Sequence, residues 1–326
     1  MTFNPKAYAK RSDEVAKNYE KREQWRKENA HLALPFFIEG LRDLVPPIFP
    51  EEMAMIGAPS GDGKTNILKV WHRQAQEAIS QSKRRAVTIF GSQEETTERL
   101  IAEDIERRGM QVASSLPSVF VGASFGMDAN HIEDMHMTNY INTLGYIQNS
   151  MFAEPMPFAA EFYDYVQATP NDPSRREIVN NDAYRHQLTD NVRRLFQSTK
   201  TFHCPLVTAS QTDIKTDKNK YSKEIPIPGR GDFSESSGIF QIPDFVYSFV
   251  HMRNASTVGK HIEDGHWNFT VEKNLLFFWF LKARGHNPET TAKGLGRVFP
   301  IRIINDEYEY DPEYHRAITA KKEVSQ

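Results

Sequence analysis

The sequence predicts an α/β fold with a mostly parallel central sheet, flanked by helices, and a β-rich C-terminal end. Short apolar runs alternate with segments of helical periodicity as far as about residue 209, a pattern typical of βαβ units. A glycine-rich turn lies between the first apolar run and the first helical segment. Beyond about residue 245, further apolar runs follow without long helices between them, so the chain is expected to end in strands.

The first βαβ unit has the clearest pattern. Residues 53–56 are an apolar run that ends at Gly57, and they predict the first strand. Residues 65–80 carry apolar side chains at helical spacing and predict the first helix of the core. Residues 86–90 are the next apolar run, and residues 96–108 predict the helix that follows it.

The later elements are predicted from the same two patterns. Residues 123–155 are rich in Met and Asn and are expected to be helical in part. Residues 181–199 have helical periodicity and predict a long helix. The remaining apolar runs predict strands at residues 118–121, 158–163, 205–209, 245–252, 266–272, 275–283 and 297–304.

Composition excludes several classes of protein. The 326 residues include 40 Lys and Arg against 43 Asp and Glu, which gives a net charge of −3 and excludes a globally basic nucleic-acid binder, though not a local basic patch. Mean hydropathy is −0.60, and the longest apolar run, residues 275–281, is much shorter than the roughly 20 residues of a membrane helix. One cysteine, Cys204, excludes an internal disulfide framework and a cysteine-rich zinc site. We therefore expect a cytoplasmic protein without a membrane partner.

The chain divides into an arm, a core and a tail. Residues 1–32 combine charges of both signs with helix-forming residues and no glycine, which predicts a charged helical arm. A narrow apolar stripe along the arm fits either a solvated helix or one that docks on a neighbouring subunit. Residues 33–310 are expected to form one α/β domain, and residues 311–326 a polar C-terminal tail.

The strongest motif is Gly57-Ala-Pro-Ser-Gly-Asp-Gly-Lys-Thr65, which lies between a predicted strand and a predicted helix as a phosphate-binding loop requires. Glycines let the backbone wrap closely around phosphate oxygens, and the helix N-terminus favours an anion. Lys64 can reach the β- and γ-phosphates, and the Thr65 hydroxyl can ligate Mg²⁺. We expect nucleotide binding by Ser60, Gly61, Asp62, Gly63, Lys64 and Thr65. Strict spacing places Ala58 at the position of the first glycine.

An ATPase also needs a carboxylate that orients water and an acidic residue near Mg²⁺. Glu94 follows the second predicted strand and is the candidate for the first role, whereas Asp164 ends a later strand and is the candidate for the second. Each has an ordinary structural explanation as well. Glu94 and Glu95 fit the N-terminal turn of a helix, and Asp164 fits a strand-end turn. Glu161 is unusual for a central buried strand.

At this point the residues resemble the RecA-like ATPase domain of DnaB-type replicative helicases. The resemblance rests on the order and spacing of six segments across about residues 35–305: the phosphate-binding loop, Ser92-Gln-Glu-Glu95, Asp164-Tyr-Val-Gln167, Ala209-Ser-Gln211, the segment 232–241 with Asp244, and Lys282-Ala-Arg284. It implies that Glu94 is catalytic, that Thr65 and Asp164 hold Mg²⁺, and that Gln211 senses the γ-phosphate. It also implies that Lys282 and Arg284 act on the γ-phosphate bound by the adjacent subunit.

The departures from the family pattern are informative. Ser234 stands where the family usually has arginine, and Phe240 stands where it has glutamate, so the DNA contacts of that segment are in doubt. Only the charged arm precedes the core, so we expect a motor without the family's N-terminal primase-binding domain, of the sort that phages and plasmids carry. Its cytoplasmic setting would then be that of a bacterial host.

The segment after Gln211 is the candidate DNA-binding loop. Residues 214–230 contain five basic residues and two acidic ones. In a ring, such a loop would point toward the pore, where it could bind the backbone phosphates of single-stranded DNA. A solvated, mobile surface loop explains the same composition. The basic side chains are Lys215, Lys218, Lys220, Lys223 and Arg230.

The resulting hypothesis is a ring-forming DNA helicase, commonly of six subunits, that uses ATP and Mg²⁺ at subunit interfaces and moves on single-stranded DNA. Replication or loader proteins are further candidate partners. The alternative is an ATP-switched assembly or loading ATPase of the same fold that does not unwind DNA. A small-molecule kinase would be a monomer with an arginine-rich lid, and the segments that end at Gln167 and Gln211 argue against it.

Overall fold

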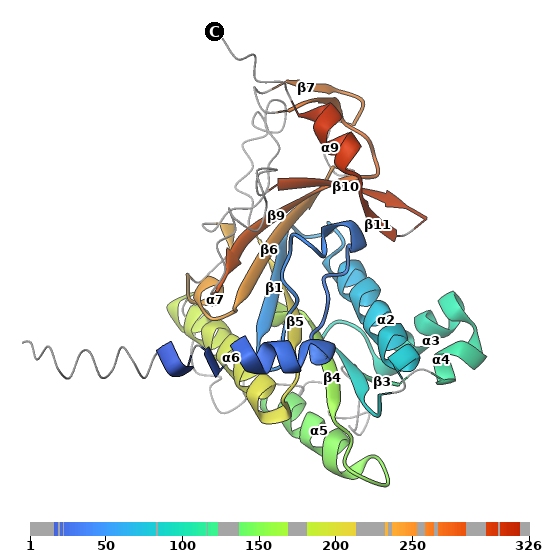
Figure 1. Cartoon of the computed structure of the whole chain (residues 1–326), viewed down its shortest axis with the longest axis vertical. Coiled ribbons are helices and arrows are strands. Elements are labelled where there is room, and N and C mark those ends of the chain that lie inside the picture. Colours follow the sequence, from blue (N-terminus) through green and yellow to red (C-terminus); the bar gives the residue numbers. More distant parts are fainter. Residues whose placement is uncertain are drawn as a thin grey trace, which may run out of the picture.

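A nine-stranded sheet forms the centre of the molecule, with its strands in the order β11-β10-β9-β6-β1-β5-β4-β2-β3 (Figure 1). The computed structural model describes residues 16–18, 20–21, 23–82, 84–115, 117–122, 137–168, 181–212, 232–233, 237–252, 258–263, 267–284, 298–305 and 307–319. The strands of this sheet are β1 (Met53–Ala58), β2 (Val87–Ser92), β3 (Ser118–Val121), β4 (Phe158–Asp164), β5 (Leu206–Gln211), β6 (Phe245–His251), β9 (Leu275–Ala283), β10 (Val298–Ile304) and β11 (Glu307–Tyr310).

Helices connect most of the parallel strands along the chain. The α-helices are α2 (Lys64–Ser82), α3 (Thr97–Arg108), α4 (Met110–Ser115), α5 (Met137–Ser150), α6 (Asn181–Phe202), α7 (Ser237–Gln241) and α9 (Pro312–Ile318). The short 3-10 turns are η1 (Ala30–Leu32), η2 (Glu39–Leu41) and η4 (Val166–Ala168). None of the helices among the described residues has the length and apolar character required to cross a membrane.

The predicted fold class is confirmed. The strands from β6 across to β3 are all parallel to their neighbours, whereas β9, β10 and β11 pair antiparallel at the other end of the sheet. The parallel strands are the ones that helices separate along the chain, because a parallel connection must cross back over the sheet. The antiparallel strands follow one another closely along the chain, so they give the C-terminal end its β-rich character.

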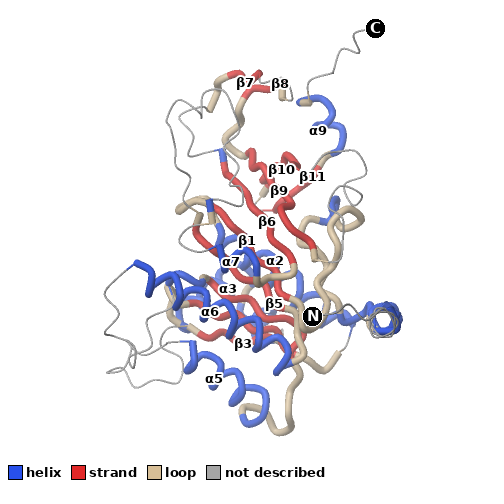
Figure 2. Tube along the Cα trace, turned by 90° about the vertical axis from the view of Figure 1, so that its left-hand side faces the viewer, coloured by secondary structure: helices blue, strands red, loops and turns tan. Residues whose placement is uncertain are grey.

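Both faces of the parallel strands are buried. In β1 the side chains alternate, so Ala54 and Ile56 pack with α2 on one face while Met53 and Met55 pack with α5 and α6 on the other. Figure 2 shows α5 and α6 together on their side of the sheet. Burial on both faces explains why these strands read as continuous apolar runs in the sequence.

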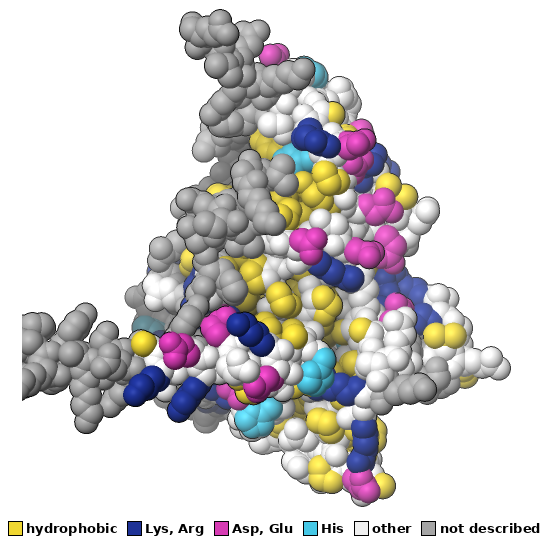
Figure 3. All heavy atoms as spheres, in the orientation of Figure 1, with side chains coloured by type: hydrophobic (Ala, Val, Ile, Leu, Met, Phe, Trp, Pro, Cys, Tyr) yellow, Lys and Arg dark blue, Asp and Glu magenta, His cyan; other side chains and the backbone are white. Residues whose placement is uncertain are grey.

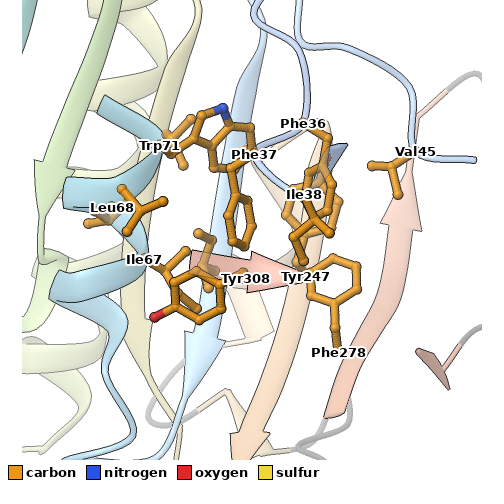
Figure 4. Packing of buried hydrophobic residues seen from close by; sticks show 14 of the residues in the cluster. Phe36, Phe37, Ile38, Val45, Ile67, Leu68, Trp71, Tyr247, Phe278 and Tyr308 are labelled. Atoms are coloured by element: carbon orange, nitrogen blue, oxygen red, sulfur yellow. The ribbon is translucent and has the colours of Figure 1, made fainter. Parts of the chain in front are cut away.

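Residues 34–45 cover the face of the sheet beside α2 (Figure 4). The Phe36 ring lies 5.4 Å from Trp71 on α2 and 5.0 Å from Phe278 on β9, measured between ring centroids. The indole Nε1 of Trp71 donates a hydrogen bond of 2.8 Å to the carbonyl oxygen of Pro35. This segment therefore bridges the first helix of the core and the antiparallel strands.

The arm is helical at residues 16–18, 20–21 and 23–28. Its end contacts the body through Trp25, whose ring lies 6.3 Å from that of Phe49, and through an ion pair between Arg26 and Glu52. Trp25 remains 40% exposed, so the body covers only part of this side chain.

The C-terminal part differs from the sequence prediction in two places. The strand expected at residues 266–272 is only β8 (Asn268–Thr270), which pairs with β7 (His261–Glu263) in a separate two-stranded sheet. A polar tail is expected from residue 311, but helix α9 begins directly after Asp311. Asp311 is the N-cap of this helix, and its Oδ1 accepts hydrogen bonds from the backbone N–H groups of Glu313 and Tyr314. The buried side chain of Ile318 anchors this helix, which is too short for its periodicity to be recognised.

Candidate nucleotide-binding site

The glycine-rich loop joins the carboxyl end of β1 to the first turn of α2, as the motif predicts. Gly61 and Gly63 have φ angles of 79° and 92°, a region that favours glycine. Ser60 and Gly61 are exposed at the mouth of the loop. Exposed backbone at the start of a long helix is a site that favours an anion.

Lys64 lies inside this loop. Its Nζ donates hydrogen bonds to the carbonyl oxygens of Ala58 at 3.2 Å and Pro59 at 3.0 Å. Burial lowers the pKa of the ammonium group, and the charges of Asp164, Asp62 and Glu94 oppose that shift. No carboxylate among the described residues forms an ion pair with Lys64, so its charge is available to an anion that enters the loop.

Asp62 ties the loop to the neighbouring strand. Its side chain is buried, and Oδ2 accepts a hydrogen bond of 3.0 Å from the backbone N–H of His251 at the end of β6. A buried carboxylate needs such a donor to offset its desolvation. The Asp62 side chain therefore has a structural role in the loop. Its backbone N–H is a separate group, and it is the part of Asp62 that is expected to bind a phosphate.

Asp164 and Thr65 meet beside the loop. The Thr65 hydroxyl donates a hydrogen bond of 2.7 Å to Asp164 Oδ2, while Asp164 Oδ1 is buried and has no hydrogen-bond partner among the described residues. Burial raises the pKa of Asp164 to about 6, with the nearby Glu94 and Glu95 adding to the shift and the Thr65 hydrogen bond opposing it. A hydroxyl and a carboxylate with a free oxygen are hard ligands that suit Mg²⁺.

The metal position would be incomplete without a nucleotide. Among the described residues no group of three or more His, Cys, Asp or Glu side chains could hold a metal ion. Mg²⁺ is usually bound by one or two protein ligands together with substrate phosphates and water. The pair of Thr65 and Asp164 fits that mode and not a metal cage built from protein alone.

The structure separates the two glutamates after β2. The Ser92 hydroxyl accepts hydrogen bonds from the backbone N–H groups of both Glu94 and Glu95, which fixes the turn. Glu95 turns back and pairs with Lys69 on α2 at 2.7 Å. Glu94 is exposed, forms no ion pair with a described residue, and lies close enough to Lys64 and Asp164 to influence the pKa of both. Glu94 is therefore the carboxylate that remains available for chemistry.

Gln211 ends β5 beside the start of the loop. It is in register with Ala58 on β1, and the N–H of the next residue, Thr212, donates a hydrogen bond of 3.0 Å to the Ala58 carbonyl oxygen. The structure thus brings Lys64, Thr65, Asp164, Glu94 and Gln211 to the same edge of the sheet. The carboxyl ends of parallel strands are the usual ligand-binding edge of such sheets.

The structure explains why residue 57 is a glycine, which the motif alone does not. A Cβ atom added to Gly57 would lie 2.3 Å from Cζ of Phe233, so the aromatic ring occupies the space that a side chain would need. Phe233 in turn packs against Phe240, with ring centroids 5.7 Å apart. Phe240 is therefore part of the core, which explains an aromatic side chain at this position.

Lys282 and Arg284 lie near the amino ends of the parallel strands, away from the glycine-rich loop. Arg284 pairs with Asp244 at 3.2 Å, and Asp244 Oδ2 accepts a hydrogen bond from the N–H of Met53 at the amino end of β1. The Lys282 Nζ donates to the carbonyl oxygens of Phe240, Gln241 and Pro243. Because β1 rises about 3.3 Å per residue, its two ends are about 17 Å apart. Neither side chain reaches the nucleotide loop of its own chain.

The expected DNA contacts cannot be placed. Lys215, Lys218, Lys220, Lys223 and Arg230 lie outside the described residues, as does Ser234. On the face shown in Figure 3, the described Lys and Arg side chains are interspersed with Asp and Glu, so this face presents no uniformly positive patch among them.

Sequence reasoning assigned no role to several residues that build the site. Gln167 bonds to the end of β5 through its side-chain amide, and Phe233 packs on Gly57. Lys69 restrains Glu95, and Ser92 fixes the turn of Glu94. The contacts of Gln167, Phe233 and Lys69 join segments that are far apart in the chain, so spacing along the sequence gives no signal for them. The Ser92 turn is local, and a serine two residues before Glu94 is the sequence signal that could have found it.

Comparison with known proteins supports the fold. The chain matches no protein-family model, and no curated protein matches it. Among solved structures it is similar to the ATPase domain of G40P, with a TM-score of 0.57 and 13% identity over 92% of this chain and 98% of that one. It is also similar to a DnaB-like replicative helicase, studied with its interactions with primase, with a TM-score of 0.53 and 13% identity over 80% of this chain. The match spans 58% of that helicase. The chain therefore has the fold of a DnaB-type, RecA-like ATPase domain.

Proposed function

We propose that this chain is the ATPase motor of a ring-forming DNA helicase, which hydrolyses ATP at subunit interfaces and moves on single-stranded DNA. The observation that carries the proposal is the hydrogen-bonded pair of Thr65 and Asp164 beside the glycine-rich loop that holds Lys64. Asp164 is buried, and its Oδ1 has no hydrogen-bond partner among the described residues. The likeness to two helicase domains supports the same assignment.

Each residue of the site has a distinct part in the proposed reaction. Lys64 and the loop N–H groups bind the phosphates, and Thr65 with Asp164 would hold Mg²⁺. Bound Mg²⁺ would neutralise charge on the β- and γ-phosphate oxygens. Glu94 orients the attacking water and accepts its proton, and Gln211 contacts the γ-phosphate from the end of β5.

The position of Arg284 supports catalysis between subunits. An arginine that stabilises the transition state can come from the same chain or from a neighbour. In this chain Arg284 lies near the amino end of β1, whereas the loop follows the carboxyl end. Its guanidinium group could therefore act only on a nucleotide bound by a neighbouring subunit. A closed ring, commonly of six subunits, gives every loop such a neighbour.

The first test compares neighbouring glutamates. Glu94→Gln should abolish ATP hydrolysis and leave ATP binding intact, whereas Glu95→Gln should retain most of the hydrolysis because Glu95 is engaged with Lys69. Lys64→Ala should lose both binding and hydrolysis. Measured turnover in Glu94→Gln equal to that of the unmodified protein would remove Glu94 from its assigned role.

The second test concerns the shared site. Arg284→Ala and Lys64→Ala subunits should each be inactive alone, and mixing them should restore part of the ATPase activity, because a mixed interface can combine an intact loop with an intact arginine. Mass measurement in solution with ATP and a single-stranded oligonucleotide should detect the ring. Full activity from a lone protomer would contradict a shared site.

The alternative is an ATP-switched assembly or loading ATPase without unwinding activity. Phe240 favours it, because this aromatic core residue departs from the helicase-family pattern that the sequence resembles. A forked DNA substrate separates the two functions. Strand displacement supports the helicase, and DNA-stimulated hydrolysis without displacement supports the alternative. Replication or loader proteins remain candidate partners, because the chain shares its fold with a replicative helicase.

A further inference from the structure

Among the described residues, the end of β5 pairs with a strand on one side only. Its pairing with β1 continues as far as Ala58 and Gln211, but its pairing with β4 stops at Tyr163 and Thr208. Beyond Asp164 the chain leaves the sheet and enters the turn η4. In the part of the chain that the structure describes, no strand therefore continues the ladder with β4 beside Ser210 and Gln211.

Gln167 occupies that side. From η4, its Nε2 donates hydrogen bonds to Ser210 Oγ at 2.8 Å and to the Gln211 carbonyl oxygen at 3.1 Å. Its Oε1 accepts a hydrogen bond of 3.1 Å from the Gln211 N–H. Both main-chain polar groups of Gln211 are thus bound by one side-chain amide, as a neighbouring strand would bind them.

The turn that carries Gln167 is itself held in place. Val166 is buried in the cluster that α5 and α6 form with the sheet, and Gln167 is only three residues beyond Asp164. The amide therefore joins the strand end that carries the proposed metal ligand to the strand end that carries the proposed γ-phosphate sensor.

We infer that Gln167 is a positioning residue, which holds the backbone of Gln211 so that its side chain meets the γ-phosphate. This inference rests on the proposed ATPase function. A side-chain amide offers an N–H donor and a carbonyl acceptor on one planar group, as a peptide unit does. Glutamate at this position keeps the acceptor but loses the donor when ionised, and leucine of similar size loses both.

The test measures kcat, KM for ATP and nucleotide affinity for Gln167→Leu and Gln167→Glu in the full chain. A displacement of about 1 Å at a reacting group can cost a factor of roughly 100. We expect kcat to fall at least tenfold in Gln167→Leu, less in Gln167→Glu, and the dissociation constant of a fluorescent ATP analogue to stay within about twofold. A residue that only stabilises the fold would lower the melting temperature without this separation of kcat from binding.

A double mutant decides whether the effect passes through Gln211. In a Gln211→Ala background, Gln167→Leu should cause no further loss of kcat, because the side chain that it positions is already absent. An equal loss in both backgrounds, or an unchanged kcat in Gln167→Leu and Gln167→Glu, would overturn the inference. If Gln167→Leu does not fold, Gln167→Glu with the same background comparison gives the decision. Absence of hydrolysis in the unmodified protein would instead overturn the proposed function and, with it, this inference.

Discussion

Replacing Glu161 by glutamine should make the protein more stable at neutral pH and should weaken the pH dependence of its stability. Glu161 lies in the middle of β4 and is fully buried. Its Oε1 accepts a hydrogen bond of 3.0 Å from the Tyr140 hydroxyl, and its Oε2 accepts one of 3.3 Å from Ser198 Oγ. Burial raises the pKa of Glu161 from 4.5 to about 8, although both hydrogen bonds oppose the shift.

The size and sign of the effect follow from proton binding. Between pH 4.5 and about 8 the folded protein keeps the Glu161 proton while the unfolded chain has released it. The folded state then binds more protons, so the free energy of unfolding falls as pH rises, by about 1.4 kcal/mol per pH unit. From pH 5 to pH 8 this single group should remove roughly 3 to 4 kcal/mol. Glutamine cannot ionise and does not incur that cost.

Denaturant unfolding of both proteins at pH 5, 6, 7 and 8 provides the measurement. The difference in unfolding free energy between Glu161→Gln and the unmodified protein should grow steadily with pH. Glu154→Gln is the matched control, because Glu154 is exposed and pairs with Arg85 at the surface, and its difference should stay near zero. A Glu161→Gln curve parallel to that of the unmodified protein would show that Glu161 is not a buried neutral acid.

Three further predictions concern the loop and its surroundings. Gly57→Ala should destabilise the protein by about 1 to 3 kcal/mol, because its Cβ would lie 2.3 Å from the Phe233 ring, and Phe233→Leu should recover part of that loss in thermal unfolding. Thr65→Ala should raise the Mg²⁺ concentration needed for half-maximal hydrolysis, whereas Thr65→Ser, which keeps the hydroxyl, should not; equal Mg²⁺ requirements in both variants would count against Thr65 as a ligand. Asp311→Ala removes the N-cap of α9 and should lower the denaturant midpoint of unfolding, and an unchanged midpoint would mean that the cap is dispensable.

Much of the parallel core could be predicted from the sequence because its signals are local. The strand, the glycine-rich loop and the helix of residues 53–82 are adjacent in the chain, and each has its own composition or period. The same holds for β9, which is a long apolar run with the predicted bounds. The candidate carboxylates were found because they follow apolar runs, and strand ends are readable from the sequence.

The parts that could not be predicted depend on contacts between distant segments. Glu161 looked out of place in a buried strand, and only the fold supplies Tyr140 and Ser198 as its partners. Gln167 meets Gln211 across 44 residues of chain. Residues 34–45 have no strand or long helix pattern, so their role as a cover over the sheet depends on the apolar side chains that they place against Trp71.

In the proposed ring, the two ends of β1 would contribute to two different nucleotide sites. At the carboxyl end the strand continues into the loop that holds Lys64, and at the amino end the N–H of Met53 bonds to Asp244, which pairs with Arg284. In a ring, the loop at the carboxyl end would bind the nucleotide of its own subunit. Arg284 at the amino end would act on the nucleotide that the neighbouring subunit binds. Asp244 would then connect the strand that leads into the loop of one subunit with the arginine offered to the next. Asp244→Asn tests this connection, because it keeps an acceptor for Met53 and weakens the ion pair with Arg284. Hydrolysis should fall while nucleotide binding by the same subunit stays unchanged, and a variant with full turnover would show that Arg284 needs no such support.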